Sequence, residues 1–331
     1  MQIAVVGSGG WGTALAKLLT ENGHEVTLWS FLKEESEQLQ KTRENPLLKG
    51  VKLPDMVFTC DPACVAGKKV VVMASPSFAA RSTSELVKPY LDQDAVLVSV
   101  AKGIEAGTSK RLSEIIGEVT GRTVAVICGP SHAEEVGRGI PTGCVAACPD
   151  IRLAEMLQDI FMNENFRVYS STDVVGVELG AALKNVIALC AGICDGMGFG
   201  DNTKALLMTR GLTEMARLGM AMGSRHDTFA GLAGVGDLIV TCTSMHSRNR
   251  RASILIGQGK DPQAAMQEVG AVVEGYYAAK SAYELSQKMG VEMPIAAEAY
   301  AILYEGKDAR EAVRSLMTRS KRHEFEDAGW Q

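Results

Sequence analysis

Short apolar runs alternate with longer amphipathic stretches through the first half of the chain. This alternation constrains the fold strongly, because a strand that is apolar at successive positions must be buried on both faces of its sheet. The expected strands are Ile3–Gly7, Glu25–Trp29, Val70–Ala74, Ala95–Val100, Val124–Cys128, Gly143–Cys148 and Phe166–Ser170. The expected helices between them include Trp11–Glu21, Lys33–Arg43, Phe78–Tyr90 and Thr108–Val119. Strands separated by helices predict a mostly parallel sheet in an α/β domain.

The pattern changes near residue 172, after which convincing strands disappear. Helical spacing of apolar residues covers Val174–Cys194, Ala205–Met222, Val272–Met289 and Pro294–Tyr304. We therefore divide the chain into an α/β domain over residues 1–172, expected to bind a dinucleotide, and an all-helical domain over residues 173–331, expected to bind substrate and carry catalysis. The proline-containing segment Asn45–Asp55 is expected to be a long loop.

Charge and composition exclude several classes of protein. The 34 lysines and arginines and 39 acidic residues give a net charge of −5, so the chain lacks the overall positive field of a nucleic-acid binder. No segment is expected to span a membrane and no signal peptide is recognised, so we expect a cytoplasmic protein. The eight cysteines include pairs at i,i+4 spacing with no histidine beside them, which favours free thiols over a metal site.

A glycine-rich segment, Gly7-Ser-Gly9-Gly-Trp-Gly12, directly follows the first expected strand and opens the first expected helix. In a dinucleotide-binding turn the first glycine permits a tight turn, the second lets the backbone approach a pyrophosphate, and the third lets the helix pack close to the sheet. The helix N-terminus then presents N–H groups to the phosphates. The alternative is a glycine-rich turn that binds nothing. The position between strand and helix favours a Rossmann-type domain with Gly7, Gly9 and Gly12 in the cofactor site.

The end of the second expected strand bears on the choice of cofactor. An acidic residue at this position usually holds the ribose of NADH, whereas a nearby cation accommodates the 2′-phosphate of NADPH. Here the strand ends Leu28-Trp29-Ser30-Phe31, without a carboxylate, and Lys33 is the nearest cation. The sequence therefore favours NADPH, or the use of both cofactors. The alternative is that Lys33 is one more exposed charge on a charged helix.

Lys184 is the one charged residue in the apolar segment Leu179–Cys194. A helix that is apolar all round is buried, and a lysine is almost never fully buried unless it is paired or functional. Desolvation lowers the pKa of an ammonium group, so a buried lysine can exchange protons near neutral pH and can protonate the alkoxide formed in a carbonyl reduction. The alternatives are a lysine that reaches the surface and a structural ion pair.

Two later segments could supply partners for Lys184. Asp237 lies in a run of small and apolar residues and could orient the lysine, bind a substrate hydroxyl or cap a helix. Ser247, Arg248 and Asn249 open an expected helix and could bind a phosphate through side-chain donors and backbone N–H groups. The alternative is a solvated basic turn, which would account for one or two of the arginines in this region.

Further candidates follow two expected strands, at the edge where open α/β sheets bind ligands. Lys102 comes after Ala95–Val100 and could balance the charge of a phosphate. Gly129, Ser131 and His132 come after Val124–Cys128. We assign His132 a structural role, because Lys184 already supplies an acid–base group.

Together these segments resemble the bacterial-type NAD(P)-dependent glycerol-3-phosphate dehydrogenases over nearly the whole chain. The segments that carry the resemblance are Gly7–Ala14, Ala101–Gly103, Gly129–Ser131, Leu183–Asn185, Asp195–Gly200, Thr209–Met215, Gly231–Thr241, Ser247–Arg251 and Val272–Tyr276. A lone glycine motif is weak support, whereas this ordered series is specific.

The resemblance implies reversible reduction of dihydroxyacetone phosphate to sn-glycerol 3-phosphate for phospholipid synthesis, with Lys184 as the general acid/base. The implied substrate contacts are Lys102, Gly129, Ser131, Lys184, Asp237, Ser247, Arg248 and Asn249. The implied cofactor contacts are Gly10, Trp11, Phe31, Lys102, Ala133, Arg248, Val272 and Glu274. The family often has arginine or histidine where this chain has Phe31, so this residue leaves the preference between NADH and NADPH open.

Two other functions fit parts of the pattern. A related dehydrogenase for a β-hydroxyacid or a sugar nucleotide would have carboxylate or uridine contacts in place of the phosphate anchor within the segment Ser247–Arg251. A redox sensor would bind NAD(P)H without turnover and expose an apolar partner surface, which a buried Lys184 argues against. We expect the chain to bind a small phosphorylated substrate and no nucleic acid. A homodimer is compatible with the sequence, as is a monomer.

Overall fold

The computed structural model describes residues 1–244, 248–270 and 273–324. Its internal contacts divide the chain into two compact units. The first unit comprises Met1–Glu105 and Lys110–Val174, and the second comprises Val175–Gln331 with the short segment Ala106–Ser109. Each unit is described by itself.

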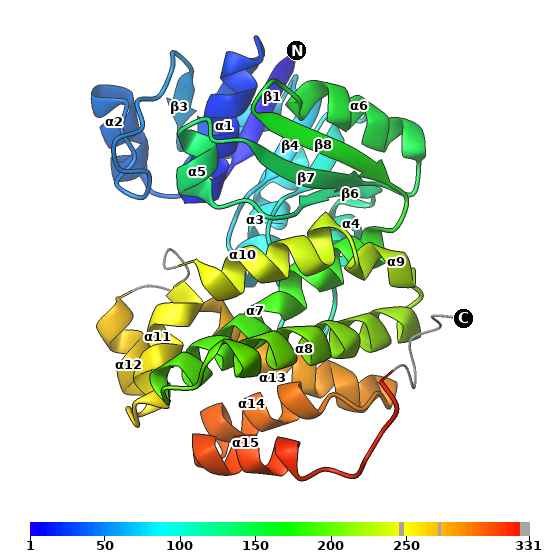
Figure 1. The fold of residues 1–331 in the computed structure, drawn as a ribbon. Helices are drawn as coiled ribbons and strands as arrows, with labels where there is room; N and C mark the ends of the chain where they lie inside the picture. Colours follow the sequence, from blue (N-terminus) through cyan, green and yellow to red (C-terminus); the bar gives the residue numbers. More distant parts are fainter. Residues whose placement is uncertain (245–247, 271–272, 325–331) are drawn as a thin grey trace. The chain divides into compact units, whose positions relative to one another are not determined.

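The first unit, which is described throughout, is built on an eight-stranded sheet with the order β3-β2-β1-β4-β5-β6-β7-β8 (Figure 1). Its strands are β1 (Gln2–Val6), β2 (Glu25–Trp29), β3 (Val57–Thr59), β4 (Val70–Met73), β5 (Val96–Ser99), β6 (Val124–Cys128), β7 (Thr142–Ala147) and β8 (Phe166–Ser171). Neighbouring strands are parallel except β6 and β7, which confirms the predicted mostly parallel sheet.

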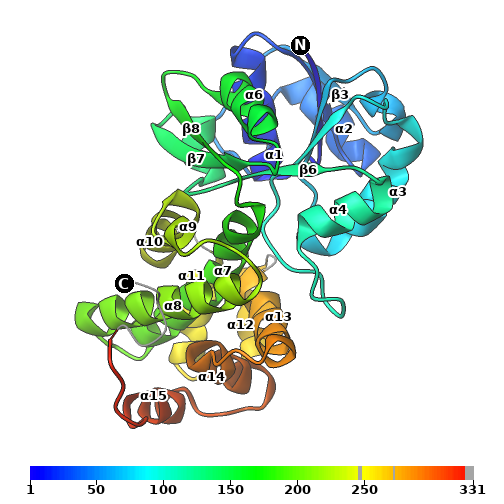
Figure 2. The same cartoon turned by 90° about the vertical axis from the view of Figure 1, so that its right-hand side faces the viewer.

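Helices cover both faces of this sheet, as the unbroken apolar strands require. They are α1 (Gly10–Glu21), α2 (Lys33–Thr42), α3 (Ala80–Val87), α4 (Leu112–Thr120), α5 (Ala133–Gly137) and α6 (Ile151–Phe161). In β1, Ile3 and Val5 share a hydrophobic cluster with residues of α1 and α6, whereas Ala4 and Val6 share another with residues of α3 and α4. Figure 2 shows these two pairs of helices on opposite sides of the sheet.

Three local expectations in this unit are corrected. The expected helix Phe78–Tyr90 is α-helical only over α3, and 3₁₀ turns flank it at Ser77–Ala79 and Lys88–Tyr90. The expected helix Thr108–Val119 begins only at Leu112, and the Glu114 carboxylate accepts a hydrogen bond at 2.8 Å from the backbone N–H of the preceding Arg111. The sequence also missed β3, which has three residues and pairs only with β2, at the edge of the sheet.

In its described residues the second unit consists of helices joined by loops, without a strand, as predicted for this part of the chain. Its α-helices are α7 (Val174–Gly196), α8 (Asp201–Ala221), α9 (His226–Phe229), α10 (Asp237–Thr243), α11 (Arg248–Gly257), α12 (Pro262–Val269), α13 (Glu274–Met289), α14 (Pro294–Tyr304) and α15 (Ala309–Met317). A π-helical turn, η4 (Leu232–Gly236), immediately precedes α10. Such turns occur frequently at functional sites.

The sequence analysis expected no segment long and apolar enough to span a membrane. By length and composition alone, α7 contradicts that expectation. Among the described residues, this helix alone is long and apolar enough to cross a bilayer. In the structure, however, 83% of its most apolar window is buried inside the protein. That burial is typical of the core helix of a soluble unit.

A buried carboxylate joins two helices of the second unit. Glu214, on α8, is 3% exposed and accepts hydrogen bonds from the backbone N–H groups of Ile295 at 2.8 Å and Ala296 at 3.3 Å. These N–H groups lie in the first turn of α14, where they have no partner within the helix. Burial raises the pKa of Glu214 to about 7, although the two N–H donors oppose the shift.

The raised pKa of Glu214 predicts a pH-dependent contribution to stability. Between its ordinary value of 4.5 and about 7, the folded chain holds a proton that the unfolded chain releases, so this contribution is lost as the pH rises through 7. We expect the free energy of unfolding of Glu214→Gln, relative to the unsubstituted chain, to rise by about 1–3 kcal/mol from pH 5 to pH 8. Urea unfolding at both pH values measures this difference, and a constant or falling difference would contradict the assignment.

Candidate active site

The glycine-rich loop between β1 and α1 has the geometry of an anion site. Gly7 has φ +126°, and a Cβ there would lie 2.6 Å from the Ala74 carbonyl oxygen. A Cβ at Gly12 would collide with the Gly7 carbonyl oxygen, so this glycine is needed for the close approach of helix and turn. A Cβ at Gly9, by contrast, would meet no atom of the described chain within 4 Å. The backbone at Gly9 therefore faces open space that a ligand can occupy.

The start of α1 offers donors to that space. In the described part of the chain, no side chain caps its N-terminus, and its first turn contains no acidic residue. Trp11, in the same turn, is half-buried, and its indole N–H is buried without a hydrogen-bond partner among the described residues. A helix N-terminus with unsatisfied N–H groups binds phosphates well. The loop therefore fits a dinucleotide pyrophosphate.

Side chains that the sequence did not single out hold the loop in place. The Ser8 carbonyl oxygen accepts hydrogen bonds from Thr13 Oγ1 at 3.1 Å and from Asn45 Nδ2 at 2.9 Å. Asn45 also donates to Thr13 Oγ1 at 2.7 Å, and both side chains are buried. Asn45 lies in the segment predicted as a long loop. A polar residue in such a segment gives no sequence signal for a contact with a turn so far away in the chain.

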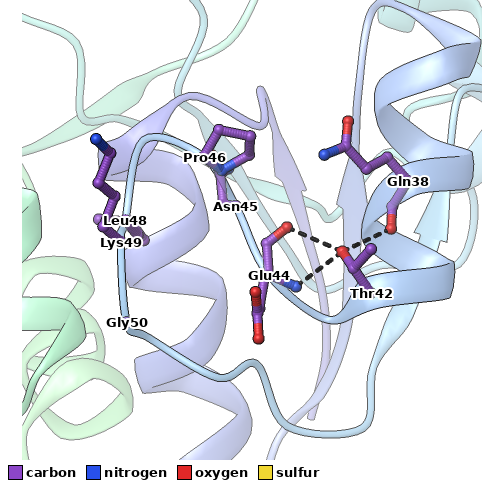
Figure 3. A pocket seen from close by; sticks show the side chains of 8 residues that line it. All are labelled: Gln38, Thr42, Glu44, Asn45, Pro46, Leu48, Lys49 and Gly50. Atoms are coloured by element: carbon purple, nitrogen blue, oxygen red, sulfur yellow. Dashed lines mark hydrogen bonds between the residues drawn. The ribbon is translucent and has the colours of Figure 1, made fainter.

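A hollow of about 290 Å³ lies beside Asn45, between the end of α2 and the loop that follows it (Figure 3). The residues that line it are Gln38, Thr42, Glu44, Asn45, Pro46, Leu48, Lys49 and Gly50. The Thr42 hydroxyl group donates to the carbonyl oxygens of Gln38 and Glu44. None of the predicted site residues lines this hollow, so we assign it no part in the reaction.

The region after β2 presents an aromatic ring and opposing charges. Phe31 is 75% exposed. Lys33 lies 3.5 Å from Glu37 in an exposed i,i+4 ion pair. Glu35 accepts a hydrogen bond at 3.0 Å from the Ser8 hydroxyl of the glycine-rich loop. A carboxylate therefore does reach this loop. It comes from α2, whereas an acidic residue that holds the ribose of NADH usually lies at the end of β2.

The residues after β5 and β6 come together as predicted. Lys102 Nζ donates to the Gly129 carbonyl oxygen at 3.0 Å and to Ser131 Oγ at 3.4 Å. Gly129 has φ +153°, and a Cβ there would lie 2.9 Å from Cys144 Cα on the neighbouring β7. Ala133 begins α5, and its Cβ would lie 3.6 Å from a Cβ at Gly10. These residues share the carboxyl-end region of the sheet with the glycine-rich loop.

The second unit contains a buried ion pair centred on Lys184. The lysine is 5% exposed, and its Nζ donates to Asp237 Oδ1 at 2.5 Å and to Thr241 Oγ1 at 2.6 Å. Asp237 is fully buried, and the Thr241 hydroxyl donates to the Asp237 carbonyl oxygen at 2.7 Å. A buried charge needs such a partner, because desolvation is costly. Asp237 therefore pairs with Lys184, and it is the first residue of α10, whose N-cap position is Gly236.

The backbone around Asp237 explains how its carboxylate reaches Lys184. The π-helical turn η4 ends at Gly236, and Asp237 is the first residue of α10. A Cβ at Gly180, one turn before Lys184 on α7, would collide with the Ala233 carbonyl oxygen of η4. The missing side chain lets η4 lie directly against α7. Sequence analysis missed Thr241, although its i,i+4 spacing from Asp237 places both side chains on one helix face.

Asn185 and Glu274 form a second polar contact next to this ion pair. Asn185 follows Lys184 on α7, is 4% exposed, and donates from Nδ2 to Glu274 Oε2 at 3.4 Å. Glu274 is the first residue of α13 and is one of the predicted cofactor contacts. Within this unit, the structure therefore brings a predicted cofactor residue into contact with the residue that follows the predicted catalytic lysine.

Several predicted residues cannot be placed in this way. Ser247 and Val272 lie outside the described residues. Arg248 and Asn249 belong to the first turn of α11, of which the structure describes the backbone. No group of three or more histidine, cysteine or acidic side chains in the described ranges could hold a metal ion, and all eight cysteines are free thiols.

Family models match both parts of the chain. The model for the N-terminus of NAD-dependent glycerol-3-phosphate dehydrogenase matches residues 2–154. The model for the C-terminus of NAD-dependent glycerol-3-phosphate dehydrogenase matches residues 173–314.

Full-length relatives agree with these matches. A protein of Thermoanaerobacter sp. (strain X514) named as an NAD(P)+ glycerol-3-phosphate dehydrogenase is 56% identical over 327 residues, which cover 98% of this chain and 99% of the relative. One of Moorella thermoacetica with the same name is 52% identical over 331 residues, with 99% of each protein covered.

Solved structures support the same assignment. The glycerol-3-phosphate dehydrogenase of Coxiella burnetii matches with a TM-score of 0.92 and 37% identity, covering 96% of this chain and 99% of that one. A ketopantoate reductase of Ralstonia eutropha, 16% identical with a TM-score of 0.62 over 95% of this chain and all of that one, shares the fold alone. These matches confirm the resemblance found in the sequence: the chain belongs to the family of NAD-dependent glycerol-3-phosphate dehydrogenases.

Proposed function

We propose that this oxidoreductase catalyses the reversible reduction of dihydroxyacetone phosphate to sn-glycerol 3-phosphate, with Lys184 as the general acid/base. The observation that carries this proposal is the buried contact of Lys184 with Asp237 and Thr241, in a chain of this family. A reduction of a ketone needs a proton donor for the alkoxide that forms, and a preoriented ammonium group supplies one.

The glycine-rich loop and its neighbours are proposed to bind the cofactor. Bound reduced nicotinamide supplies the hydride for C2 of the substrate. The loop fits the pyrophosphate because its backbone at Gly9 faces open space and the α1 N-terminus offers N–H donors. The residues proposed to contact the cofactor are Gly7, Gly9, Gly10, Trp11, Gly12, Phe31, Lys102, Ala133, Arg248, Val272 and Glu274.

Lys184 is proposed to move the proton at the C2 oxygen. An ammonium group has three N–H donors, and those that Asp237 and Thr241 accept fix its orientation. The negative charge of Asp237 stabilises the protonated form that reduction requires. After the proton has moved to the substrate, the neutral amine is the base for the reverse reaction.

Substrate binding is proposed to depend on the phosphate. Arg248 and Asn249, in the first turn of α11, would supply a guanidinium and an amide, and Ser247, which precedes them in the sequence, would supply a hydroxyl. Phosphate oxygens accept hydrogen bonds from all three groups. Lys102, Gly129 and Ser131 are proposed as further contacts, and these three already form a hydrogen-bonded group. The product would supply glycerol phosphate for phospholipid synthesis in the cytoplasm. Whether two copies of the chain assemble stays a separate question.

Replacement of Lys184 tests its role as proton donor. We expect Lys184→Met to lower kcat by at least ~100-fold, because a general acid typically contributes a factor of this size. The readout is the oxidation of the reduced cofactor at 340 nm with saturating dihydroxyacetone phosphate.

This substitution leaves the Asp237 carboxylate buried without its partner, so Lys184→Met combined with Asp237→Asn is the control for folding. Circular dichroism and thermal unfolding show whether each variant is folded. A folded double variant with near-normal kcat would remove Lys184 from the mechanism.

Replacement of Arg248 tests the phosphate site. We expect Arg248→Ala to raise the KM for dihydroxyacetone phosphate by about 10- to 100-fold, since a charge-assisted contact to phosphate is lost. Dihydroxyacetone, which lacks the phosphate, should be reduced with nearly the same kcat/KM by both proteins. An equal loss for the two substrates would show that Arg248 does not anchor the phosphate.

We further propose that the chain uses both NADH and NADPH, with two charges after β2 acting in opposite directions. Lys33 favours the 2′-phosphate of NADPH, as the sequence suggests, although it also pairs with Glu37. Glu35 contacts Ser8 of the cofactor loop, and its carboxylate would repel a 2′-phosphate nearby. The preference for NADPH inferred from the sequence therefore depends on which charge dominates.

Two substitutions measure this balance. We expect Lys33→Gln to lower, and Glu35→Gln to raise, the ratio of kcat/KM for NADPH to kcat/KM for NADH by roughly 3- to 10-fold each, the range of a partly screened charge interaction. Initial rates at low ionic strength with both cofactors give the ratio. Changes of the same sign in the two variants would refute the proposed opposition.

A further inference from the structure

We propose that Asp195, Lys204 and Arg250 form a clasp that positions the start of α11 for binding the substrate phosphate, with Arg250 as a positioning residue. This inference rests on the proposed function, because it takes the start of α11 as the phosphate site. It assigns a role to one of the arginines near Arg248 that sequence analysis could not distinguish from a solvated charge.

The clasp is a partly buried network of charges from three helices. Asp195 lies near the end of α7, and its Oδ1 is 2.8 Å from Lys204 Nζ on α8. Its Oδ2 accepts two hydrogen bonds from Arg250 on α11, from Nε at 3.0 Å and from a terminal guanidinium nitrogen at 2.8 Å. All three side chains are less than a fifth exposed. Although burial opposes ionisation, the two cations hold the pKa of Asp195 below its usual value.

Arg250 also reaches the end of α10. Its other terminal nitrogen donates to the Thr243 carbonyl oxygen at 3.4 Å. Thr243 is the last residue of α10, so the Arg250 side chain links the end of this helix to α11. A cation is favourable at this position, because the last carbonyl groups of a helix carry partial negative charge.

In addition to these charged contacts, close packing of the two backbones holds α11 against α7. A Cβ at Gly192 of α7 would lie 2.9 Å from the Arg250 carbonyl oxygen. A Cβ at Gly196 would collide with the Ile254 carbonyl oxygen, and one at Gly257 would collide with the Ile193 carbonyl oxygen. The two helix backbones therefore touch along this line, and the clasp fixes the end of α11 at which the phosphate contacts begin.

The network thus ties α11 to the two helices that carry the Lys184 centre. Lys184 is on α7, and Asp237 and Thr241 are on α10. Lys184 is held by Asp237 and Thr241, whereas Arg250 is held by Asp195 and the Thr243 carbonyl oxygen. Loss of the clasp should therefore weaken phosphate binding and leave proton transfer largely intact. This separation distinguishes a positioning role from a general loss of stability.

The test compares Arg250→Gln with Asp195→Asn, their combination, and Arg251→Gln as the matched control. Arg251 is the next residue of α11 and is exposed. We expect Arg250→Gln and Asp195→Asn each to raise the KM for dihydroxyacetone phosphate by about tenfold, the effect of one charged hydrogen bond, with kcat changed by less than about threefold. Arg251→Gln should keep the KM of the unsubstituted chain, and none of the variants should change kcat/KM for dihydroxyacetone.

The double variant supplies a further criterion. If Arg250 acts through Asp195, the combined substitution should raise the KM no further than the more severe single one.

Asp195→Asn preserves the shape of the side chain and both cations, so it tests the clasp even if Arg250→Gln fails to fold. Thermal unfolding shows whether each variant is folded. A KM for Arg250→Gln and Asp195→Asn equal to that of Arg251→Gln would overturn the inference, as would equal losses with both substrates. An unsubstituted chain that does not reduce dihydroxyacetone phosphate would instead overturn the proposed function.

Discussion

A lysine buried in an apolar helix is the constraint on which the helical unit depends. An ammonium group at 5% exposure is stable only with a carboxylate in direct contact, so Asp237 must reach Lys184. The π-helical turn η4 ends directly before Asp237, and the glycine at position 180 of α7 leaves the space that η4 occupies. Stability and the proposed chemistry therefore depend on the same arrangement, because the contacts that allow the charge to be buried also orient the N–H donors of the proposed proton carrier.

The sheet unit is governed by a different constraint, the close approach of backbone to backbone around the cofactor loop. Gly7 and Gly12 are required by space, whereas Gly9 leaves its side of the loop open. The loop depends in turn on Thr13 and Asn45, which hold the Ser8 carbonyl oxygen. These polar contacts stabilise a strained turn without occupying the N–H donors of α1, which remain available to a phosphate-bearing ligand.

Periodicity was sufficient to predict the elements that are long or buried on both faces, such as β6 and α14, whose bounds agree with those expected. It could not predict β3, because three residues at a sheet edge show no pattern. For the site, a lone charge in an apolar segment identified Lys184, since burial of a charge is visible in composition. Thr241 and Asn45 were missed because their roles arise from tertiary contacts, and a threonine or an asparagine is ordinary in either segment. The apolar run around Lys184 was recognised as a buried helix, but its length, sufficient to cross a membrane in α7, was not.

The proposed mechanism requires Lys184 to exchange a proton with the oxygen on C2 of the substrate. A crystal structure of the chain with NAD+ and sn-glycerol 3-phosphate would show whether the two groups meet. We expect the C2 oxygen to lie within roughly 2.6–3.2 Å of Lys184 Nζ, with Asp237 still in contact with the amine. A substrate bound with its C2 oxygen beyond hydrogen-bond reach of Lys184, or beside another acid–base group, would contradict it.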